Sequence, residues 1–463
     1  MMTLQAAAKA IHAQWQGADN VFNAVTTDSR SIAAGDLFVA IKGAHFDGHA
    51  FVTDVIRQGA AGAMVSESFA IKNPDLPLIV VADTRLGLGA LAAAWRAQFS
   101  LPLIGVTGSN GKTTVKEMCA AILRAQAALD GHGNEAAVLA TEGNFNNDIG
   151  LPLTLLKLRS THSAAVIEMG MNHVGEIDYL TRLTRPTVAM VTNAHRAHLA
   201  GLGSIQNVAL AKGEIFAGLD EKGIAVFNAD DAHAELWQNL AGKTLRLTFG
   251  MKQVADVQGE FMAHGLGGMM HLHTPWGSVD IQLQVPGAHN AMNACAAAAA
   301  TLATGVSLNA VEDGLSGFRG VKGRLQLCAG LNGARVIDDT YNANPDSMRA
   351  AIDVLAGIPG RRIFVMGDMG EVGEAVAQFH DEVGGYAKSH GIDRLLCIGE
   401  FSAAAAHNFD SGGEHFSNLE ALIKTLRAEL NEQTTVLVKG SRFMRMERVV
   451  DAISAPVNQA GDK

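Results

Sequence analysis

Short apolar runs recur along the chain, each followed by a glycine or polar turn and then by an apolar pattern of helical period. After the first run, apolar side chains fall at i, i+3, i+4, i+7 and i+8, namely Val115, Met118, Cys119, Ile122 and Leu123. The runs themselves predict eight strands: Leu103–Val106, Ala164–Ile167, Val188–Thr192, Ile224–Asn228, Val336–Asp338, Ile363–Met366, Leu395–Ile398 and Val436–Val438. This alternation predicts an α/β fold of mainly parallel sheets wrapped by helices, with ligands beyond the carboxyl ends of the strands.

Chain length and breaks in the pattern of strands and helices predict the domain organisation. A chain of 463 residues is long enough for three domains at about 150 residues each. One boundary is expected near Phe99–Leu101, just before the first strong strand. Another is expected near Gly320–Arg324, where the glycine-rich basic segment GFRGVKGR interrupts the pattern. The predicted domains are therefore residues 1–99, 100–321 and 322–463.

Composition narrows the class of protein. Hydrophobic residues make up 48% of the chain and charged residues 18%, which excludes a disordered protein. The net charge of −10 argues against nucleic acid as the main partner, although local basic pockets for a phosphorylated small molecule stay allowed. The longest apolar stretch, around Ala294–Ala300, is too short and too alanine-rich for a membrane span. Without a secretory signal at its amino terminus, the chain is expected to be cytoplasmic.

The strongest chemical signal is a glycine-containing loop between the strand LIGV and the helix TTVKEM: Gly108, Ser109, Asn110, Gly111, Lys112, Thr113 and Thr114. Backbone N–H groups of such a loop point at phosphate oxygens, and the helix N-terminus adds a positive dipole. Lys112 is expected to bind the β- and γ-phosphates, and Thr113 or Thr114 to offer a hydroxyl to Mg²⁺. Because Val106 stands where the common P-loop has its first glycine, this is a shortened T-G-x-x-G-K-T form. The alternative is a purely structural turn.

Three further residues are candidates for the metal site that a triphosphate needs. Glu168 ends the strand AAVIE, where its carboxylate can face the loop and hold Mg²⁺ directly or through water; the alternative is an ordinary surface carboxylate. His198 in TNAHRAHL and Lys212 in LAKGEIF are weak signals, since a single histidine usually packs and a single lysine usually faces solvent. The residues alone give Lys212 no role.

Together these motifs resemble the Mur ligase family, the ATP-dependent amide-bond-forming enzymes of peptidoglycan precursor synthesis. The blocks that carry the resemblance span most of the chain: TDSRSIAAGDLFVAIKG, FDGHAF, TGSNGKTTVKEM, TEGNFNNDIGLPLTLL, EMGMNHVGEI, AHLAGLGS, AKGEIF, PGAHNAMNACAAAA, GRLQ, DDTYNANPDSM, MGDMGEVGE and VKGSRFMRME. The resemblance implies an N-terminal UDP-sugar-binding domain, a central ATPase domain and a C-terminal Rossmann-like domain. It further implies a ligase that adds D-alanyl-D-alanine to UDP-N-acetylmuramoyl-tripeptide through an acyl phosphate.

The resemblance also implies roles for individual residues. Lys112, Thr113 and Glu168 match the phosphate and magnesium positions, His198 matches a further metal ligand, and Lys212 matches a lysine that carries a carbamate. ATP, two Mg²⁺ ions and the carbamylated lysine are thus the implied cofactors. Other matching positions are the ATP site (Asn290, Asn293, Arg324 and Asp339), the muramoyl-peptide block (Thr141, Asn146 and Asn147) and the uridine-side block (Ser29 and Arg30). The dipeptide is expected near Asn342 and Asn344, where DDTYNANPDSM follows the strand RVID, although such residues also form turns.

The chain departs from the family pattern around the candidate histidine. Where the family block reads closer to AHLEGFGS, Ala200 and Leu202 replace the acidic and aromatic residues, and the preceding His195-Arg196 pair is also unusual. Two alternative functions stay open. A folylpolyglutamate synthase shares the short loop and the acyl phosphate, but it lacks a UDP-sugar domain before the loop. A GTPase-like switch needs an N-K-x-D guanine motif, which is absent from this sequence.

Overall fold

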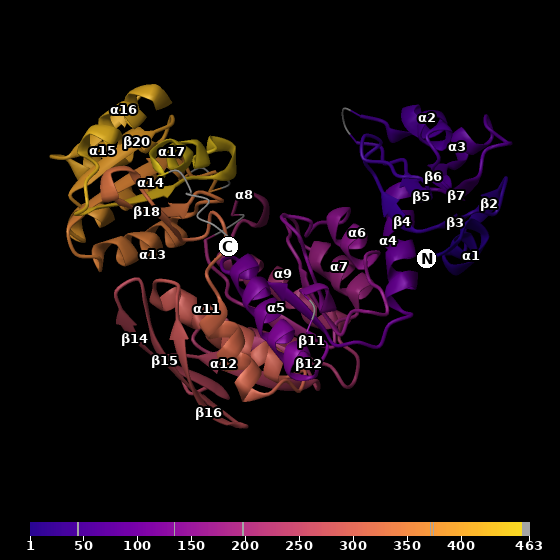
Figure 1. Ribbon diagram of the computed structural model, residues 1–463, viewed down its shortest axis with the longest axis horizontal. Coiled ribbons are helices and arrows are strands. Elements are labelled where there is room, and N and C mark those ends of the chain that lie inside the picture. Colours follow the sequence, from indigo (N-terminus) through magenta and orange to yellow (C-terminus); the bar gives the residue numbers. More distant parts are fainter. Residues whose placement is uncertain (44–45, 134, 197–198, 371, 374, 456–463) are drawn as a thin grey trace, which may run out of the picture.

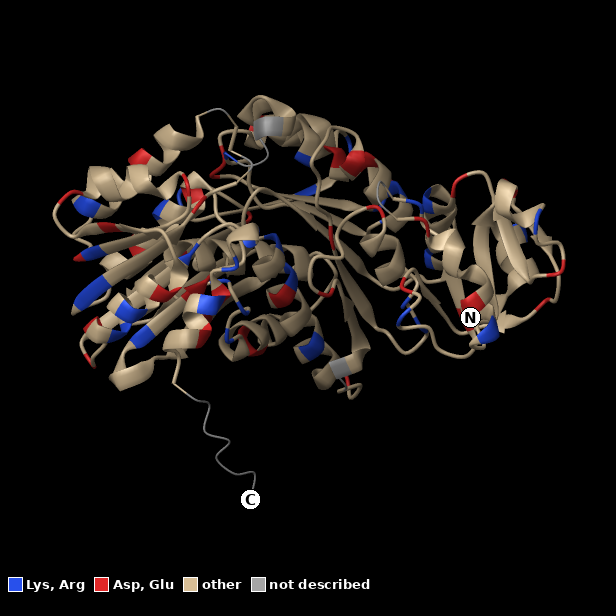
Figure 2. Ribbon diagram, turned by 90° about the horizontal axis from the view of Figure 1, so that it is seen from above, with Lys and Arg blue, Asp and Glu red and all other residues tan. Residues whose placement is uncertain are grey.

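Three α/β lobes follow one another along the chain in the computed structural model (Figure 1). The structure describes residues 1–43, 46–133, 135–196, 199–370, 372–373 and 375–455. Figure 2 shows acidic and basic residues intermingled over all three lobes. Within the described ranges, no helix combines the length and apolar character needed to cross a bilayer.

The N-terminal lobe holds a five-stranded sheet in the order β2-β7-β6-β5-β4, parallel except for β2. Its strands are β2 Gln14–Gln16, β4 Ala24–Thr26, β5 Asp36–Val39, β6 Gly62–Ser66 and β7 Leu78–Val81, with a separate pair, β1 Met2–Thr3 and β3 Val21–Phe22. Its helices are α1 Leu4–Ala10, α2 Val52–Arg57, α3 Glu67–Ala70 and α4 Thr84–Arg96.

Helix α4 joins this lobe to the next. Leu88, Leu91 and Trp95 on α4 belong to one apolar cluster that includes side chains of both lobes. Trp95 Nε1 donates to the carbonyl of Leu158 at 3.1 Å. The buried Arg96 donates from Nε to the carbonyl of Thr184 at 3.0 Å. The N-terminal and central lobes therefore share a core along α4.

The central lobe contains a nine-stranded sheet in the order β16-β15-β14-β13-β12-β11-β8-β10-β9. Its strands are β8 Leu103–Thr107, β9 Val138–Ala140, β10 Ala164–Glu168, β11 Val188–Val191, β12 Ile224–Asn228, β13 Leu245–Gly250, β14 Val257–His264, β15 Gly267–Thr274 and β16 Gly277–Leu283. Its helices are α5 Lys112–Leu129, α6 Gly150–Leu155, α7 Glu176–Thr184, α8 Leu199–Leu202, α9 Ile205–Gly213, α10 Ala234–Ala241, α11 Ala288–Leu302 and α12 Leu308–Gly317. Because β8 lies between β10 and β11, their carboxyl ends flank the loop that follows β8.

The C-terminal lobe has a six-stranded sheet in the order β17-β18-β22-β19-β20-β21, parallel except for β17. Its strands are β17 Gln326–Ala329, β18 Arg335–Asp339, β19 Arg361–Gly367, β20 Arg394–Ile398, β21 Gly413–Phe416 and β22 Thr434–Lys439. Its helices are α13 Pro345–Ala356, α14 Val376–Ser389, α15 Ser402–Phe409, α16 Leu419–Glu429 and α17 Glu447–Ile453. Separate apolar clusters cover the two faces of the sheet.

The α/β class with mainly parallel sheets is confirmed, and all eight predicted strands are present. The antiparallel ribbon β14–β16 was not among the predicted strands. Its side chains alternate between buried and exposed positions, so it shows none of the continuous apolar runs on which the prediction was based. The domain limits at residues 99 and 321 stay predictions.

Candidate functional site

The loop between β8 and α5 depends on two glycines. Gly108 and Gly111 have φ values of +150° and +81°, a region that side chains disfavour. A Cβ atom on Gly108 would lie 1.9 Å from Thr192 Oγ1, and one on Gly111 would lie 2.4 Å from Asn293 Oδ1. Residues from two other elements therefore approach the loop so closely that only glycine fits at these positions.

The segment after β11 braces this loop through Asn193, a residue that the motifs did not single out. Asn193 Oδ1 accepts a hydrogen bond from the backbone N–H of Asn110 at 2.9 Å, and its backbone carbonyl accepts from that of Ser109 at 3.0 Å. The backbone N–H of His195 donates to Ser109 Oγ at 3.0 Å. These bonds fix the loop before any ligand arrives, which lowers the cost of ordering it on binding.

Lys112, at the start of α5, folds back over its own loop. Its Nζ donates to the carbonyls of Gly108 at 2.7 Å and Ser109 at 3.3 Å. Burial lowers the pKa of Lys112; Glu168 opposes this effect, and Arg324 adds to it. Two neutral carbonyls thus accept from Lys112 where an anionic group would be a stronger partner for the ammonium.

Glu168 ends β10 beside the loop and is 2% exposed. Its Oε1 accepts from Asn146 Nδ2 at 2.7 Å, whereas its Oε2 has no hydrogen-bond partner among the described residues. The backbone N–H of Glu168 donates to Thr141 Oγ1 at 2.9 Å. One carboxylate oxygen is therefore held in place, and the other is buried with its bonding capacity unused.

Lys212, in α9, is fully buried, and its Nζ has no hydrogen-bond partner in the part of the chain that the structure describes. Burial, and after it the positive charge of Lys112, lower the pKa of Lys212 well below its ordinary value. This shift favours the neutral form of the amine, which is the form that can act as a nucleophile.

The unpartnered Oε2 of Glu168 is an oxygen donor of the kind that Mg²⁺ takes, although no group of three histidine, cysteine or carboxylate side chains that could hold a metal ion occurs in the described ranges. The unpartnered Nζ of Lys212 lies near enough to Glu168 for the carboxylate to affect its pKa, but an unmodified amine is not a magnesium ligand. His198, the other candidate ligand, lies outside the described residues.

The opposite wall comes from α11 and from the segment before β17. Asn290 Nδ2 donates to the carbonyl of Pro286 at 2.8 Å, and its Oδ1 accepts from Asn293 Nδ2 at 3.1 Å. The Arg324 guanidinium lies 3.9 Å from the ring centroid of Tyr341, and its NH2 group donates to Thr113 Oγ1 at 3.4 Å. Arg324 thus links the C-terminal lobe to the start of α5.

At the end of β18, Asp339 forms a buried ion pair with Lys439 of β22, at 2.6 Å. Lys439, which no motif argument had singled out, also donates to the carbonyl of Asn342 at 2.9 Å. Asn344 caps α13 by accepting from the backbone N–H of Ser347 at 2.8 Å, and its Nδ2 donates to Asn110 Oδ1 at 2.8 Å. The asparagine-rich turn of the C-terminal lobe therefore touches the phosphate loop.

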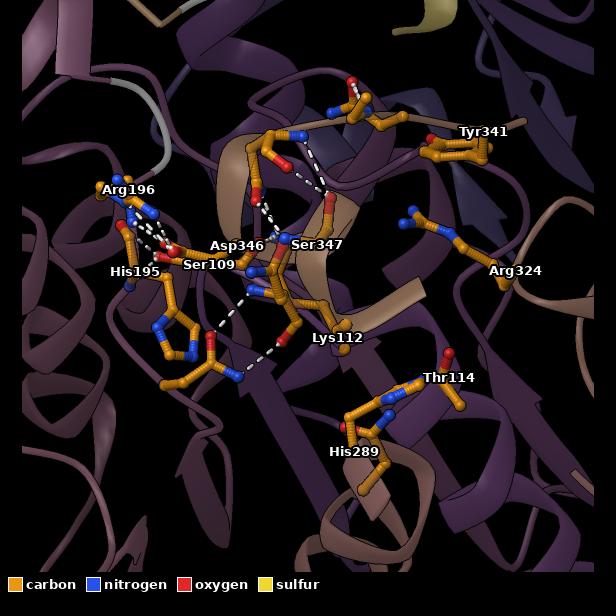
Figure 3. A pocket seen from close by; sticks show the side chains of 18 of the residues that line it. Ser109, Lys112, Thr114, His195, Arg196, His289, Arg324, Tyr341, Asp346 and Ser347 are labelled. Carbon is orange, nitrogen blue, oxygen red and sulfur yellow. Dashed lines mark hydrogen bonds and ion pairs between the residues drawn. The ribbon is translucent and has the colours of Figure 1, made fainter. Parts of the chain in front are cut away.

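Most of these groups line a cavity of about 900 Å³ between the central and C-terminal lobes (Figure 3). The candidate residues that line it are Ser109, Asn110, Gly111, Lys112, Thr114, Asn146, Asn147, Glu168, Asn290, Asn293, Arg324, Asp339, Asn342 and Asn344. Gly108, Thr113, Thr141 and Lys212 are not part of its lining. Ser29 and Arg30 belong to the N-terminal lobe, where the exposed Arg30 pairs with Asp28 at 2.7 Å.

A phosphate loop that faces a second α/β lobe across a cavity, with a further α/β lobe ahead of it, defines a three-domain nucleotide-dependent enzyme. Family models match almost end to end: "Mur ligase family, catalytic domain" over residues 21–96, "Mur ligase middle domain" over 106–301 and "Mur ligase, glutamate ligase domain" over 323–442. The chain belongs to the Mur ligase family, as the motifs predicted.

Individual relatives resemble the chain over nearly its whole length. It is 44% identical, over 98% of both chains, to UDP-N-acetylmuramoyl-tripeptide–D-alanyl-D-alanine ligase of Escherichia coli (strain K12). A solved structure of MurF from Acinetobacter baumannii is 37% identical, with a TM-score of 0.89 over 97% of this chain and 98% of that one. MurF ligase from Thermotoga maritima, solved in complex with ADP, is 26% identical, with a TM-score of 0.80 over 93% and 96%.

Proposed function

We propose that this chain joins D-alanyl-D-alanine to UDP-N-acetylmuramoyl-tripeptide at the expense of ATP, producing the pentapeptide precursor of peptidoglycan. The observation that carries the proposal is the 44% identity, over 98% of both chains, to a ligase named for this reaction. The geometry agrees with it, because the phosphate loop and the DDTYNANPDSM turn face one cavity. Since ATP and UDP-linked precursors are used inside the cell, we expect the enzyme in the cytoplasm.

The reaction has two chemical steps. The terminal carboxylate of the tripeptide attacks the γ-phosphorus of ATP, giving an acyl phosphate and ADP. The dipeptide amine then attacks the acyl carbon, and the tetrahedral intermediate loses phosphate and a proton to leave the amide. Lys112, Arg324 and the N-terminus of α5 stabilise the negative charge on the transferred phosphoryl group. Asn290 and Asn293 orient the nucleoside, and Asp339 fixes the C-terminal side of the ATP site through Lys439.

Thr113, Glu168, His198 and a carbamylated Lys212 are the residues that would hold two Mg²⁺ ions. When bound, Mg²⁺ neutralises the charge of the phosphate oxygens. A carbamate forms when the neutral amine of Lys212 attacks CO2 and releases a proton, which replaces a cation by an anionic oxygen ligand. The unpartnered, buried amine beside Glu168 supports this assignment.

Coupled turnover tests the proposed function. Phosphate release from ATP is expected to require both the dipeptide and UDP-N-acetylmuramoyl-tripeptide, with mass spectrometry detecting the UDP-pentapeptide. Glutamate and a folate in their place should give no product. Preference for a single amino acid over the dipeptide would overturn the substrate assignment, and glutamate addition to folate would favour the folylpolyglutamate alternative.

The uridine end of the substrate is assigned to residues 1–99, with Ser29 and Arg30 in contact with it. Replacing Arg30 by alanine is expected to raise KM for the UDP-substrate about tenfold, since a charge-assisted contact with the substrate is lost. The KM for ATP should stay within twofold in steady-state kinetics. Arg57 is a matched control, because it too is exposed and pairs with a nearby aspartate in the same lobe. An Arg30→Ala enzyme with the kinetics of Arg57→Ala would contradict the assignment.

Asn342 and Asn344 are assigned to the dipeptide side, where Asn344 also caps α13. Among the described residues, the side chain of Asn342 bonds only to its neighbour, its Oδ1 accepting from the N–H of Ala343 at 2.9 Å. Asn342→Ala is therefore expected to raise KM for D-alanyl-D-alanine several-fold at saturating ATP and UDP-substrate, with little change for ATP. Unchanged dipeptide kinetics would leave Asn342 as a turn residue and place the amine elsewhere.

A further inference from the structure

We propose that Arg196 is a positioning residue of the ligation reaction, which holds the start of α13 over the phosphate loop. Arg196 follows β11 in the central lobe, and Asp346 stands in the first turn of α13 in the C-terminal lobe. The backbone N–H of Arg196 donates to Asp346 Oδ2 at 3.0 Å, its Nε donates to Oδ1 at 3.1 Å and its NH2 group to Oδ1 at 2.6 Å. One carboxylate is thus held by both the main chain and the side chain of one residue.

The same guanidinium reaches a second helix of the C-terminal lobe. Its NH1 group lies 3.4 Å from Glu382 Oε2, and its carbon atom lies 5.4 Å from the centroid of the Phe379 ring; both residues belong to α14. The exposed fractions of the Arg196 and Asp346 side chains are 22% and 26%. An ion pair shielded from water in this way is stronger than the exposed pairs elsewhere on the surface.

A hydrogen bond made by Asn344, two residues before Asp346, connects the Arg196–Asp346 pair to the phosphate loop. Asn344 caps α13 and donates to Asn110 of the phosphate loop at 2.8 Å. His195, adjacent to Arg196, bonds to Ser109 of the same loop. The phosphate loop, residues 193–196 and the start of α13 therefore form one continuous hydrogen-bond network (Figure 3).

The network favours positioning over direct chemistry for Arg196. Its guanidinium is committed to Asp346 and Glu382, and although partial burial opposes the effect, Arg196 holds the pKa of Asp346 below its usual range. The pair therefore stays charged throughout the neutral pH range. A planar guanidinium with several donors can meet Asp346, Glu382 and Phe379 together, which a lysine ammonium cannot do.

Resting on the proposed function, the inference assigns Arg196 the task of keeping the amine side closed while the acyl phosphate exists. If the lobes separate, water attacks the acyl phosphate, which regenerates the carboxylate and releases phosphate without an amide. The ratio of phosphate released to amide formed therefore measures how well the central and C-terminal lobes stay closed. A residue that served stability alone would leave this ratio unchanged.

The experiment uses the full-length enzyme with both substrates and ATP, and measures phosphate and UDP-pentapeptide in the same samples. Arg196→Ala is expected to lower kcat for ligation about tenfold and to raise the ratio of phosphate to amide at least twofold, with KM for ATP within twofold. Arg196→Lys should recover part of the loss. Asp346→Ala should reproduce the defect, and the Arg196→Ala/Asp346→Ala double variant should be no worse than either single variant.

Arg182→Ala provides the matched control, because the Arg182 side chain pairs with Asp178 inside α7 and bonds to no other lobe within the described ranges. A phosphate-to-amide ratio for Arg196→Ala equal to that of Arg182→Ala would overturn the inference, as would additive losses in the double variant. Failure of the wild-type enzyme to ligate the dipeptide would instead refute the proposed function.

Discussion

Replacing Lys112 by alanine is expected to lower kcat for ligation at least a hundredfold, equivalent to about 2.7 kcal/mol of transition-state stabilisation. Among the described residues its ammonium bonds only to two carbonyls of its own loop, so the phosphates of ATP are its natural partner. Steady-state measurement of UDP-pentapeptide formation checks the loss.

The stability of the Lys112→Ala variant is expected to change little. Because burial lowers the pKa of Lys112, the folded state binds this proton less tightly than the unfolded state, so the charged side chain adds little to folding at neutral pH. The free energy of unfolding in urea should therefore change by no more than about 1 kcal/mol. Lys388→Ala, an exposed lysine on α14, serves as the control and should keep full activity. Retention of more than a tenth of the activity by Lys112→Ala would refute the phosphate role.

Lys212→Ala and Lys212→Arg are each expected to lose at least a hundredfold in kcat, since neither can carry a carbamate (about 2.7 kcal/mol). Enzyme equilibrated with ¹³C-bicarbonate should show a carbamate signal by NMR that is absent from both variants. The carbamate signal and kcat should both increase as the pH is raised through the lowered pKa of Lys212, because only the neutral amine attacks CO2.

Lys116 offers a matched control for this chemistry. It is 1% exposed, but its ammonium donates to Glu117 and to the carbonyl of Thr141, both at 2.5 Å. A cation with such partners should not be carbamylated, so Lys116→Met should keep the NMR signal. Full activity of Lys212→Ala, or a carbamate signal that survives its replacement, would contradict the assignment.

Sequence patterns within short segments predicted the strands and the loop, because these features depend on residues that are close together in the chain. Continuous apolar runs predicted the buried parallel strands, and the spacing of Gly108, Gly111 and Lys112 predicted a phosphate loop at the end of β8. The placement of Glu168 beside this loop followed from its position at the end of a strand, because parallel strands bring their carboxyl ends to one edge of the sheet, whereas its metal role stays a prediction. Family membership followed from the order of the motifs.

Contacts between distant segments could not be predicted in this way. The pairing of Asp339 with Lys439 depends on β18 and β22 being neighbours, although 100 residues separate them. Asn193 contacts the phosphate loop and Arg196 contacts the C-terminal lobe only in the folded chain, and neither residue has a local sequence signature. The low pKa of Lys212 arises from burial and from Lys112, which only the folded chain brings near.

Helix α4 sets a rule for building chimaeras between relatives. Its apolar side chains pack in a cluster that includes both the N-terminal and the central lobe, and Arg96 is tied to two carbonyls at the end of α7. A graft that exchanged residues 1–99 would place a foreign α4 against α6 and α7, and would lose activity through mispacking even if the new lobe recognised its nucleotide. A junction in the turn between β7 and α4 keeps that interface native. The boundary of the substrate-binding lobe and the boundary at which packing allows a junction therefore lie at different residues.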